Sequence, residues 1–529
     1  MDLCGFERDE DQNTQSYLFG QGPLSKNMSE TPEAGEQRPW SLLSEYFSHA
    51  AIPAAVSSLP LHAFEVVSPE GARARVALHR YRLKLRFPFG TSHSSTTHRD
   101  NALFLLSVEG SLGRSGVAGA VDGSSTITLA EAGLPPKRQY VYCSDVDDCV
   151  TFAVAWETRL RELLQNAVGA KDATCCTNTD DSCLHPLSCL SADSARPLRA
   201  ALAASSDSPR IGLLRTMLVA LDTCKPVKEG LAFTSASQAM IEVAVMSALA
   251  SYGRGTIQAT SQPDMGGIGR VHSLLGLDPR MAETLPTFYT VALNDNLAVM
   301  LESAQFGRSF TPHVKIKLDA DVAKAGRVLL ALSKWCSERD QEEEKRGLQR
   351  GKSWWSVDAN CAWSPSVAMA MLETVLLPHK GRIFMVEQPF PVELTAVRRG
   401  CARDEDVEAW KRVRQAYASH GLRIFADESM RTAADVPDLL GLVDGVNIKM
   451  EKCGGYRGGL RAAYAAREAG LALWVGCMVG SNLNSFGAAQ LVAMPGVVGC
   501  DLDGAALVTK DSEIVQGGFS FVAGHIALV

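Results

Sequence analysis

Apolar and polar residues alternate with two different periods along this chain. Tyr81-Arg82-Leu83-Lys84-Leu85-Arg86-Phe87 alternates apolar and basic residues, as expected of a strand with one buried face. The apolar run 102–108 predicts a second strand, and the small and hydroxyl residues of 90–97 predict a loop between the two. Residues 235–251 carry a helical pattern behind Ser235, a suitable N-cap.

From about residue 286, short apolar strands alternate with amphipathic helical segments. Eight strands in this alternation predict a (β/α)₈ barrel rather than an open sheet. The predicted strands are 288–293, 314–318, 355–357, 382–386, 423–426, 445–448, 473–477 and 497–502. The charged stretch 337–352 and the stretch 398–408 are interpreted as insertions into barrel loops.

These changes of pattern predict four parts of the chain. Residues 1–70 form a partly disordered N-terminal extension, and 71–284 form an α+β domain with a disordered Cys/Ser-rich insertion at about 168–210. The barrel covers 285–505, and a C-terminal segment, 506–529, follows it.

Composition narrows the class of protein. The 529 residues are 46% hydrophobic and 21% charged, which is ordinary for a globular protein. The net charge of −7 gives no field that would favour nucleic acid or an anionic membrane. The acidic start lacks the apolar stretch of a signal peptide, and no run reaches the ~18 apolar residues of a membrane span. We therefore expect a cytoplasmic enzyme with a small-molecule substrate, which could form a homo-oligomer.

The 14 cysteines of a chain without an export signal are expected to be reduced. One cluster, formed by Cys175, Cys176, Cys183, Cys189 and His185, has two interpretations. It could bind zinc, or it could be a flexible insertion with free thiols. The second is favoured, because the segment is polar and contains no CxxC pair.

Charged residues follow five successive strands of the predicted barrel, at the ends where such barrels carry their catalytic groups. Each has an ordinary interpretation alone: an acid after a strand often caps a helix, and a lysine is usually solvated. Together they would place lysines around three carboxylates, which repel one another unless a cation lies between them. Hard oxygen ligands favour Mg²⁺. In strand order, the residues are Lys315 and Lys317, Asp358 and Asn360, Glu387, Asp427 and Glu428, and Lys449.

The same residues stand in recognisable motifs. The set KxK, DxN, EQP, ADES and NIKxxKCGG resembles the muconate lactonizing enzyme subgroup of the enolase superfamily, the dipeptide epimerases in particular, from about residue 75 to the C-terminus. The resemblance implies a capping domain at 71–284 with a mobile substrate loop near 87–93. It also implies that the C-terminal segment 506–529 returns to this capping domain.

The resemblance also implies roles for single residues. Asp358, Glu387 and Asp427 would bind one Mg²⁺, beside Asn360 and Glu428. Lys317 and Lys449 would be acid/base groups on opposite faces of the substrate, with Lys315 beside the first. Two lysines flanking one carbon suit a 1,1-proton transfer next to a carboxylate, through an enediolate. No histidine occurs in 474–483, which argues against acid-sugar dehydration.

The last strand bears on the substrate. Asp501 and Asp503 resemble the pair that binds the terminal ammonium in dipeptide epimerases, although such a pair could instead cap the next helix. Cys477, Met478, Thr290 and Lys315 are expected to complete the substrate site. The loop 92–95 contains no arginine, which predicts a preference for dipeptides other than Ala–Glu.

Two kinds of alternative stay open. One is another reaction of the same subgroup: o-succinylbenzoate synthesis, N-acylamino acid racemisation or cycloisomerisation. The other is a non-catalytic barrel that serves as a binding module.

Overall fold

The computed structural model describes most of the chain from residue 41 onward. The described residues are 41–47, 52–110, 126–138, 142, 144–169, 208–224, 235–252, 271–347, 353–395, 402–514, 519–522 and 524–528. The Cys/Ser-rich insertion and its candidate zinc ligands, Cys175 to Cys189, lie outside these residues. Cys336, Cys477 and Cys500 are free thiols. Within the described residues, every helix is too short or too polar to span a bilayer.

The first half of the chain builds a four-stranded antiparallel sheet in the order β1-β2-β3-β4. Its strands are β1 His62–Val67, β2 Arg73–Gly90, β3 Ser95–Glu109 and β4 Thr126–Ala132. β2 and β3 form one long hairpin that pairs Arg73 with Glu109 at one end and Gly90 with Ser95 at the other. The predicted loop is therefore shorter than expected, because β3 already begins at Ser95.

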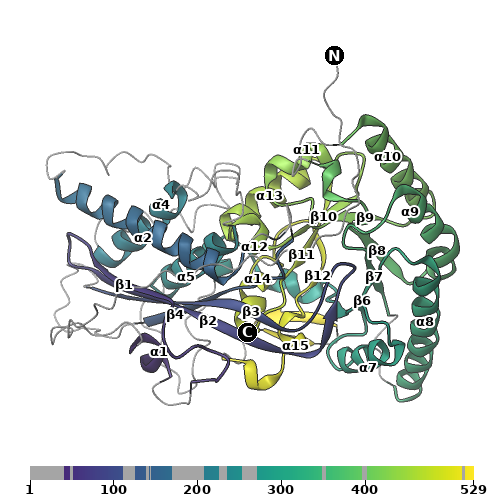
Figure 1. Ribbon diagram of the computed structural model, residues 1–529, viewed down its shortest axis with the longest axis horizontal. Helices are drawn as coiled ribbons and strands as arrows, with labels where there is room; N and C mark the ends of the chain where they lie inside the picture. The colour runs from purple at the N-terminus through teal and green to yellow at the C-terminus, as the bar shows by residue number, and fades with distance from the viewer. Residues whose placement is uncertain are drawn as a thin grey trace, which may run out of the picture. The chain divides into compact units, whose positions relative to one another are not determined.

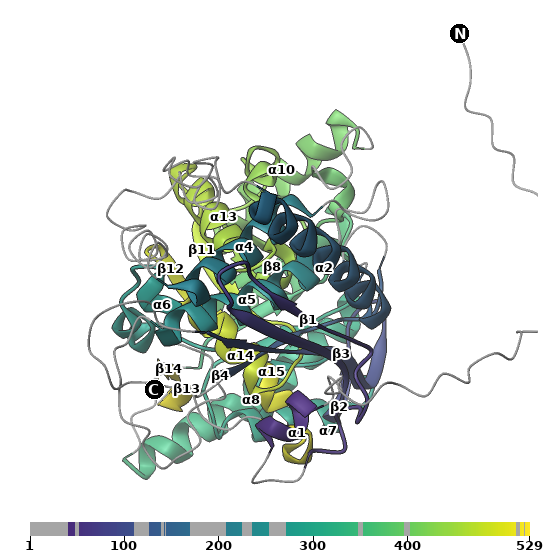
Figure 2. The same cartoon turned by 90° about the vertical axis from the view of Figure 1, so that its left-hand side faces the viewer.

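Helices cover this sheet, as Figures 1 and 2 show. α2, α4 and α5 pack on its strands, and α1 packs against β2 and β3. The bounds are α1 Ser41–Tyr46, α2 Val146–Gly169, α4 Pro209–Thr223, α5 Ser235–Tyr252 and α6 Val271–Leu274. The buried Trp156 of α2 lies edge-on to Phe64 and Phe104, at 5.8 and 6.0 Å between ring centroids, which fixes the helix on the sheet. The helix predicted at 235–251 is confirmed as α5.

The second half of the chain is an eight-stranded parallel barrel. Its strands are β5 Tyr289–Val291, β6 Val314–Lys317, β7 Trp355–Asp358, β8 Ile383–Glu387, β9 Ile424–Ala426, β10 Gly445–Ile448, β11 Ala472–Gly476 and β12 Val497–Asp501. They pair in sequence order, and a parallel bridge between Thr287 and Cys500 joins the first strand region to the last. All eight predicted strands and the predicted fold class are confirmed.

A helix follows each barrel strand, and α8, α9 and α10 form part of the outer layer in Figure 1. These helices are α7 Leu297–Gly307, α8 Val322–Lys345, α9 Pro365–Met371, α10 Asp404–Ser419, α11 Val436–Leu439, α12 Met450–Cys453, α13 Tyr456–Glu468, α14 Asn482–Ala489 and α15 Gly504–Leu507.

Much of each predicted loop insertion is helical, which corrects the sequence interpretation. Residues 337–345 extend α8, whose Asp340 and Glu343 pair with Arg308 at 2.7 and 2.9 Å. Residues 404–408 begin α10, where three acids in the first turn complement the helix dipole. High charge was read as a loop, although these residues are good helix formers.

Aromatic side chains fill the barrel interior below the mouth. Phe288, Phe425 and Trp474 are fully buried there, with the rings of Phe288 and Trp474 5.1 Å apart. A Cβ on Gly445 would lie 2.3 Å from the Phe425 ring, and one on Gly499 would lie 2.4 Å from Trp474. Glycine on these strands makes room for the rings, so the barrel below the mouth is a packed core.

The β2–β3 hairpin and the C-terminal residues both reach the barrel. Gly90 accepts a hydrogen bond from the backbone N–H of Leu293 at 2.9 Å, and a Cβ on Gly90 would lie 2.1 Å from the Leu293 oxygen. After α15, Thr509 donates its N–H to Lys84 of β2 at 2.9 Å. The chain ends with the two-stranded sheet of β13 Phe519–Val522 and β14 His525–Leu528. The strand β1 lies within the predicted extension 1–70. The proposed domain boundaries stay predictions.

Candidate active site

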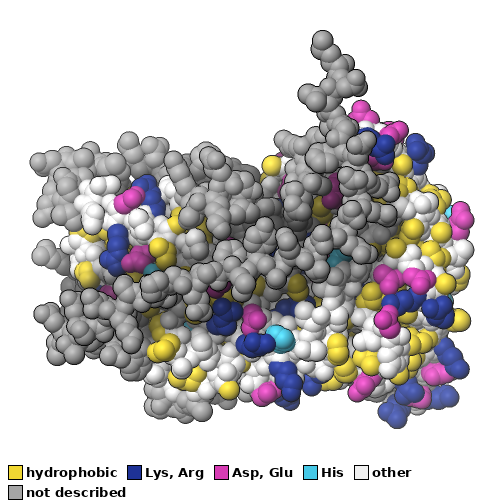
Figure 3. Space-filling model, in the orientation of Figure 1, with side chains coloured by type: hydrophobic (Ala, Val, Ile, Leu, Met, Phe, Trp, Pro, Cys, Tyr) yellow, Lys and Arg dark blue, Asp and Glu magenta, His cyan; other side chains and the backbone are white. Residues whose placement is uncertain are grey.

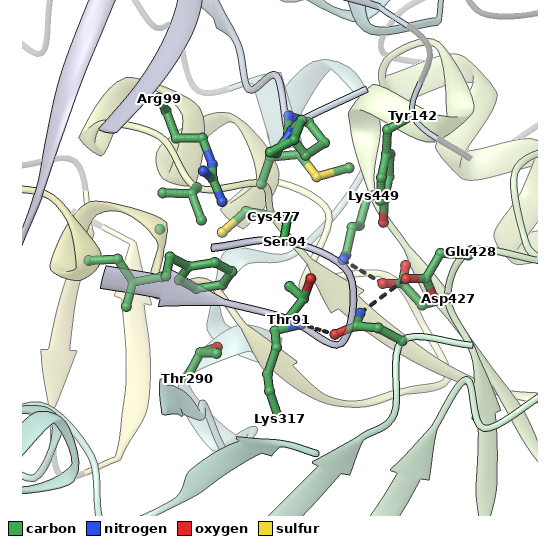
Figure 4. Close-up of a pocket in the computed structure, with 18 of the residues that line it drawn as sticks. Thr91, Ser94, Arg99, Tyr142, Thr290, Lys317, Asp427, Glu428, Lys449 and Cys477 are labelled. Carbon is green, nitrogen blue, oxygen red and sulfur yellow. Dashed lines mark hydrogen bonds and ion pairs between the residues drawn. The ribbon is translucent and has the colours of Figure 1, made fainter. Parts of the chain in front are cut away.

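The predicted lysines and acids end five neighbouring barrel strands. β7, β8 and β9, which lead to Asp358, Glu387 and Asp427, lie between β6 and β10 in the strand order. β6 carries Lys317, and Lys449 follows β10. Strands four apart in a closed eight-stranded barrel stand on opposite walls. The two lysines therefore enter the barrel mouth from opposite walls, and Figure 4 shows both of them beside the cavity.

Each of the two lysines is paired with a different acid. The Nζ of Lys317 donates to Asp358 Oδ2 at 2.7 Å and to Asn360 Oδ1 at 3.0 Å. The Nζ of Lys449 donates to Asp427 Oδ2 at 2.7 Å. Burial disfavours the ionised form of both groups. The charge of Lys449 nevertheless lowers the pKa of Asp427, and the charge of Asp427 raises the pKa of Lys449.

Lys315 lies among three carboxylates. Its Nζ is 2.5 Å from Glu387 Oε2, 2.7 Å from Asp501 Oδ2 and 3.3 Å from Asp358 Oδ2. Burial disfavours its charge, but the surrounding acids outweigh burial and hold the pKa of Lys315 well above its usual value. Burial, opposed by Lys315, raises the pKa of Glu387 to about 7.

The acids outnumber the lysines at this barrel mouth. Six carboxylates and four lysines, each at most 7% exposed, leave two negative charges without a lysine partner in this set. The carboxylates belong to Asp358, Glu387, Asp427, Glu428, Asp501 and Asp503, and the ammonium groups belong to Lys315, Lys317, Lys449 and Lys452. An excess of two buried carboxylates is costly, and a divalent cation would remove it.

The donor set fits Mg²⁺ in type and in charge. Asp358, Glu387 and Asp427 supply hard oxygens from adjacent strand ends, and Glu387 Oε2 makes no hydrogen bond, although Lys315 lies near it. Among the described residues, no three acids, histidines or cysteines already converge as metal ligands do. In this structure, the carboxylates are turned onto the lysines.

The backbone is strained where the acids leave their strands. Asn360 and Gln388 have φ values of 44° and 38°, a region that residues other than glycine rarely adopt. The buried Gln388 accepts the backbone N–H groups of Asp427 and Ser429, at 2.9 and 3.2 Å, and donates to Phe390 O at 2.9 Å. It therefore ties the end of β8 to the end of β9, which positions two acids of the proposed triad relative to each other.

Two further polar residues hold the acids, and the sequence analysis assigned neither of them a role. Asn447 Nδ2 donates to Glu387 Oε1 at 2.7 Å, and Lys452 Nζ donates to Asp427 Oδ1 at 2.5 Å. The spacing offered a signal for Asn447, since it lies two residues before Lys449 on β10 and so faces the same side. Lys452 was part of the quoted motif, one helical turn after Lys449.

The two acids of the last strand differ in their surroundings. Asp501 accepts from Trp474 Nε1 at 2.6 Å and pairs with Lys315. Asp503 occupies the N-cap position of α15 but makes no capping hydrogen bond, and it accepts from the backbone N–H of Thr290 at 2.5 Å. Burial and the charge of Asp501 raise the pKa of Asp503 to about 6. The helix-cap interpretation of Asp503 therefore fails.

These groups surround a cavity of about 330 Å³, a volume that suits a small molecule. Most of the predicted residues line it: Lys315, Lys317, Asn360, Asp427, Glu428, Lys449, Cys477, Met478, Thr290, Asp501 and Asp503. Asp358 and Glu387 are fully buried beneath the cavity lining. Both pair with the ammonium of Lys315, which does line the cavity.

The first half of the chain closes the cavity from above. His93, in the turn between β2 and β3, has its Nε2 2.8 Å from the Asn360 backbone oxygen. Phe89 places its ring 5.8 Å from Lys317 Nζ, and Arg99 and Tyr142 also line the cavity (Figure 4). The sequence analysis placed the substrate loop here but assigned no role to Tyr142 or to Arg99, which lies a few residues beyond that loop, because their positions depend on how the sheet lies over the barrel.

Comparison with known proteins agrees with this architecture. A family model described as enolase C-terminal domain-like matches residues 345–529. An enolase superfamily member from Dictyostelium discoideum is 31% identical over 443 residues, which cover 83% of this chain and 90% of that protein. The chain belongs to the enolase superfamily. The resemblance seen in the motifs is confirmed.

Other relatives match over shorter stretches. An L-Ala-D/L-amino acid epimerase from Pedosphaera parvula is 28% identical over 46% of this chain and 59% of its own length. An L-Ala-D/L-Glu epimerase from Bacteroides thetaiotaomicron is 34% identical over 31% of this chain and 38% of its own length. Among solved structures, a dipeptide epimerase from Cytophaga hutchinsonii, complexed with Mg and D-Ala-L-Val, has a TM-score of 0.54 at 18% identity, covering 86% of this chain and 92% of that one.

Proposed function

We propose that this chain is an isomerase that epimerises dipeptides by moving a proton at the carbon next to the substrate carboxylate. One observation carries the reaction type: Lys317 and Lys449 stand on opposite walls of the barrel, with the row of acids between them. Two amines that face one carbon from opposite sides can remove a proton from one face and return one to the other. That exchange inverts the stereocentre.

The protein residues have separate tasks in this reaction. Lys317, as the free amine, takes the proton from one face, and Lys449, as the ammonium, delivers one to the other. Asp358, Glu387 and Asp427 would hold one Mg²⁺, and the charge of that ion would favour the negative charge that develops on the substrate carboxylate. Phe89 and the turn at His93 cover the cavity, which excludes water from the carbanion-like centre.

Asp503 favours a dipeptide over the other substrates of the subgroup. It is 5% exposed, lines the cavity and has no basic partner among the described residues. A buried carboxylate of this kind calls for a cation, and the terminal ammonium of a dipeptide supplies one. An N-acylamino acid, such as a racemase of that class would use, has no ammonium and would leave Asp503 uncompensated.

The test is proton exchange in D₂O. The full chain with Mg²⁺ is incubated with a panel of L,L-dipeptides, and deuterium at the α-carbon of the carboxyl-terminal residue is followed by NMR together with the ratio of diastereomers. We expect deuterium incorporation coupled to epimerisation, its loss when EDTA removes the divalent cation, and its return when Mg²⁺ is added back.

Matched carboxylates separate the alternatives. N-Acetyl versions of the best dipeptides keep the reacting carbon but lack the ammonium, so they should exchange far more slowly. Faster exchange on the N-acetyl compounds would overturn the dipeptide assignment in favour of an N-acylamino acid racemase. Failure to exchange any dipeptide or N-acylamino acid would overturn the isomerase itself and favour a binding module.

A further inference from the structure

One tryptophan connects the apolar interior of the barrel to its charged mouth. Trp474 of β11 is fully buried, and its ring packs against Phe288 at 5.1 Å and Phe384 at 5.7 Å between centroids. Its Nε1 donates a hydrogen bond to Asp501 Oδ1 at 2.6 Å. A buried indole N–H needs an acceptor, and the acceptor here is a residue that lines the cavity.

The neighbouring strand β12 has room for this ring. In the register of β11 with β12, Trp474 lies opposite Gly499, and Gly476 lies opposite Asp501. Gly499 and Asp501 are two residues apart and therefore face the same side of their strand. Because Gly499 has no side chain, the indole can lie across β12 and reach the acid two residues further on.

Both oxygens of Asp501 have partners, and the partners differ in charge. Oδ1 accepts from the neutral indole, and Oδ2 lies 2.7 Å from Lys315 Nζ. Lys315 also lies 2.5 Å from Glu387, so its single charge is divided among several acids. On the described surface drawn in Figure 3, by contrast, acidic side chains lie among basic ones. The indole therefore fixes the Asp501 carboxylate without neutralising it.

Asp503 is bound differently. It accepts the backbone N–H of Thr290 and has no basic partner among the described residues, so it can contact a substrate ammonium. Asp501 adds a second negative charge at the same mouth, and a cation is attracted by both charges. The direction in which the Asp501 carboxylate faces therefore affects how tightly the cation is bound.

We propose that Trp474 is a positioning residue for substrate binding, which acts by holding the Asp501 carboxylate in place for the ammonium of the dipeptide. This inference rests on the proposed dipeptide epimerisation and adds to it a residue of the barrel core. Trp474 is not among the residues that line the cavity, so it acts through Asp501. An indole suits this role, because its one donor has a fixed direction and it carries no charge that would compete with the substrate.

Trp474→Phe tests the proposal, because it keeps an aromatic ring in the core and removes the N–H donor. A dipeptide and its N-acetyl form are compared by the exchange assay, since only the dipeptide carries the ammonium. We expect the ratio of their kcat/KM values to fall about tenfold in the variant. The fall should come from a higher KM of the dipeptide, with its kcat within about threefold of the wild type.

Trp355→Phe is the matched control. Trp355 is also fully buried, but it begins β7, at the end of the barrel away from the mouth. The control makes the same loss of packing volume, and it should leave both the ratio and the KM of the dipeptide unchanged.

The hydrogen bond has a signature that does not depend on turnover. The eight tryptophans should give eight indole N–H signals in the ¹H–¹⁵N spectrum of the deuterated, Mg²⁺-loaded chain. The Trp474 signal, identified by its loss in Trp474→Phe, should lie at low field because its acceptor is charged, and Asp501→Asn should move it upfield. If Trp474→Phe does not fold, the wild-type and Asp501→Asn spectra suffice, since one signal should move much further than the others.

An unchanged ratio of kcat/KM in Trp474→Phe, or indole signals that Asp501→Asn leaves in place, would overturn the positioning role. An equal fall of the ratio in Trp355→Phe would overturn it as well, because packing alone would then explain the effect. Absence of exchange on every dipeptide, with an indole signal that still responds to Asp501→Asn, would instead contradict the proposed function.

Discussion

Lys317→Met and Lys449→Met are each expected to lose epimerisation, by roughly 10²- to 10⁴-fold, while each still exchanges the α-proton of one diastereomer. The reason is the opposed placement of the two amines. Removing one amine leaves the other able to take and return a proton on its own face, so label enters without inversion. The magnitude is that of one general acid/base group. The measurement is stereochemically resolved deuterium incorporation, starting from each pure diastereomer.

The structure indicates that each of these two variants removes one amine without leaving a buried acid unpaired. Without Lys317, Asp358 still has Lys315 at 3.3 Å, and without Lys449, Asp427 still has Lys452 at 2.5 Å. Neither variant therefore strands a buried acid, and both should fold. Lys411→Met, at a partly exposed lysine of α10, is the matched control and should leave both activities unchanged. If the two variants lose exchange on the same diastereomer, the amines do not act from opposite faces.

Asp503→Asn is expected to raise KM for dipeptides by about 30-fold or more, which corresponds to ~2 kcal/mol for the loss of one buried charge partner. The amide oxygen can still accept the Thr290 N–H, so the change removes charge rather than structure. Asp501→Asn is less informative, because Asp501 also pairs with Lys315 and Trp474. KM and kcat are measured by the exchange assay for a dipeptide and for its N-acetyl form.

The pH dependence gives a second readout of the same residue. The pKa of Asp503 is raised to about 6, so its carboxylate is charged above that pH and neutral below it. KM of the wild type for a dipeptide should therefore rise as the pH falls through about 6, while KM of Asp503→Asn should stay flat over the same window. If Asp503→Asn keeps the wild-type KM for dipeptides at pH 8, Asp503 does not bind the substrate ammonium.

Local patterns predicted the barrel well, and the reasons are physical. Each strand is a short, fully buried apolar run, and the residue that ends it is constrained by the two-residue period of the strand. Lys315 and Lys317 must share a face, and parallel strands must open at one end. The row of acids and its opposed lysines follows from those two rules.

Other features depend on contacts far apart in the chain and could not be read locally. Arg99 precedes the run predicted as a strand, and only the packing of β3 over the barrel brings it to the cavity wall. Gln388 appeared in a quoted motif, but its role as a brace needs the backbone N–H groups of Asp427 and Ser429 in place. The charged end of α8 was misread because its partner Arg308 lies outside the segment, directly after the preceding helix, α7.

The central claim is that Asp358, Glu387 and Asp427 share one divalent ion between Lys317 and Lys449. It is tested most directly by a crystal structure of the full chain grown with Mn²⁺, with the ion located by its anomalous scattering. The account predicts a peak at about 2.1 Å from an oxygen of each of the three carboxylates. The two lysine Nζ atoms should stand on opposite sides of the adjoining cavity. The account would be contradicted by an ion that contacts fewer than two of these carboxylates, or by two lysine Nζ atoms on the same side of the ion.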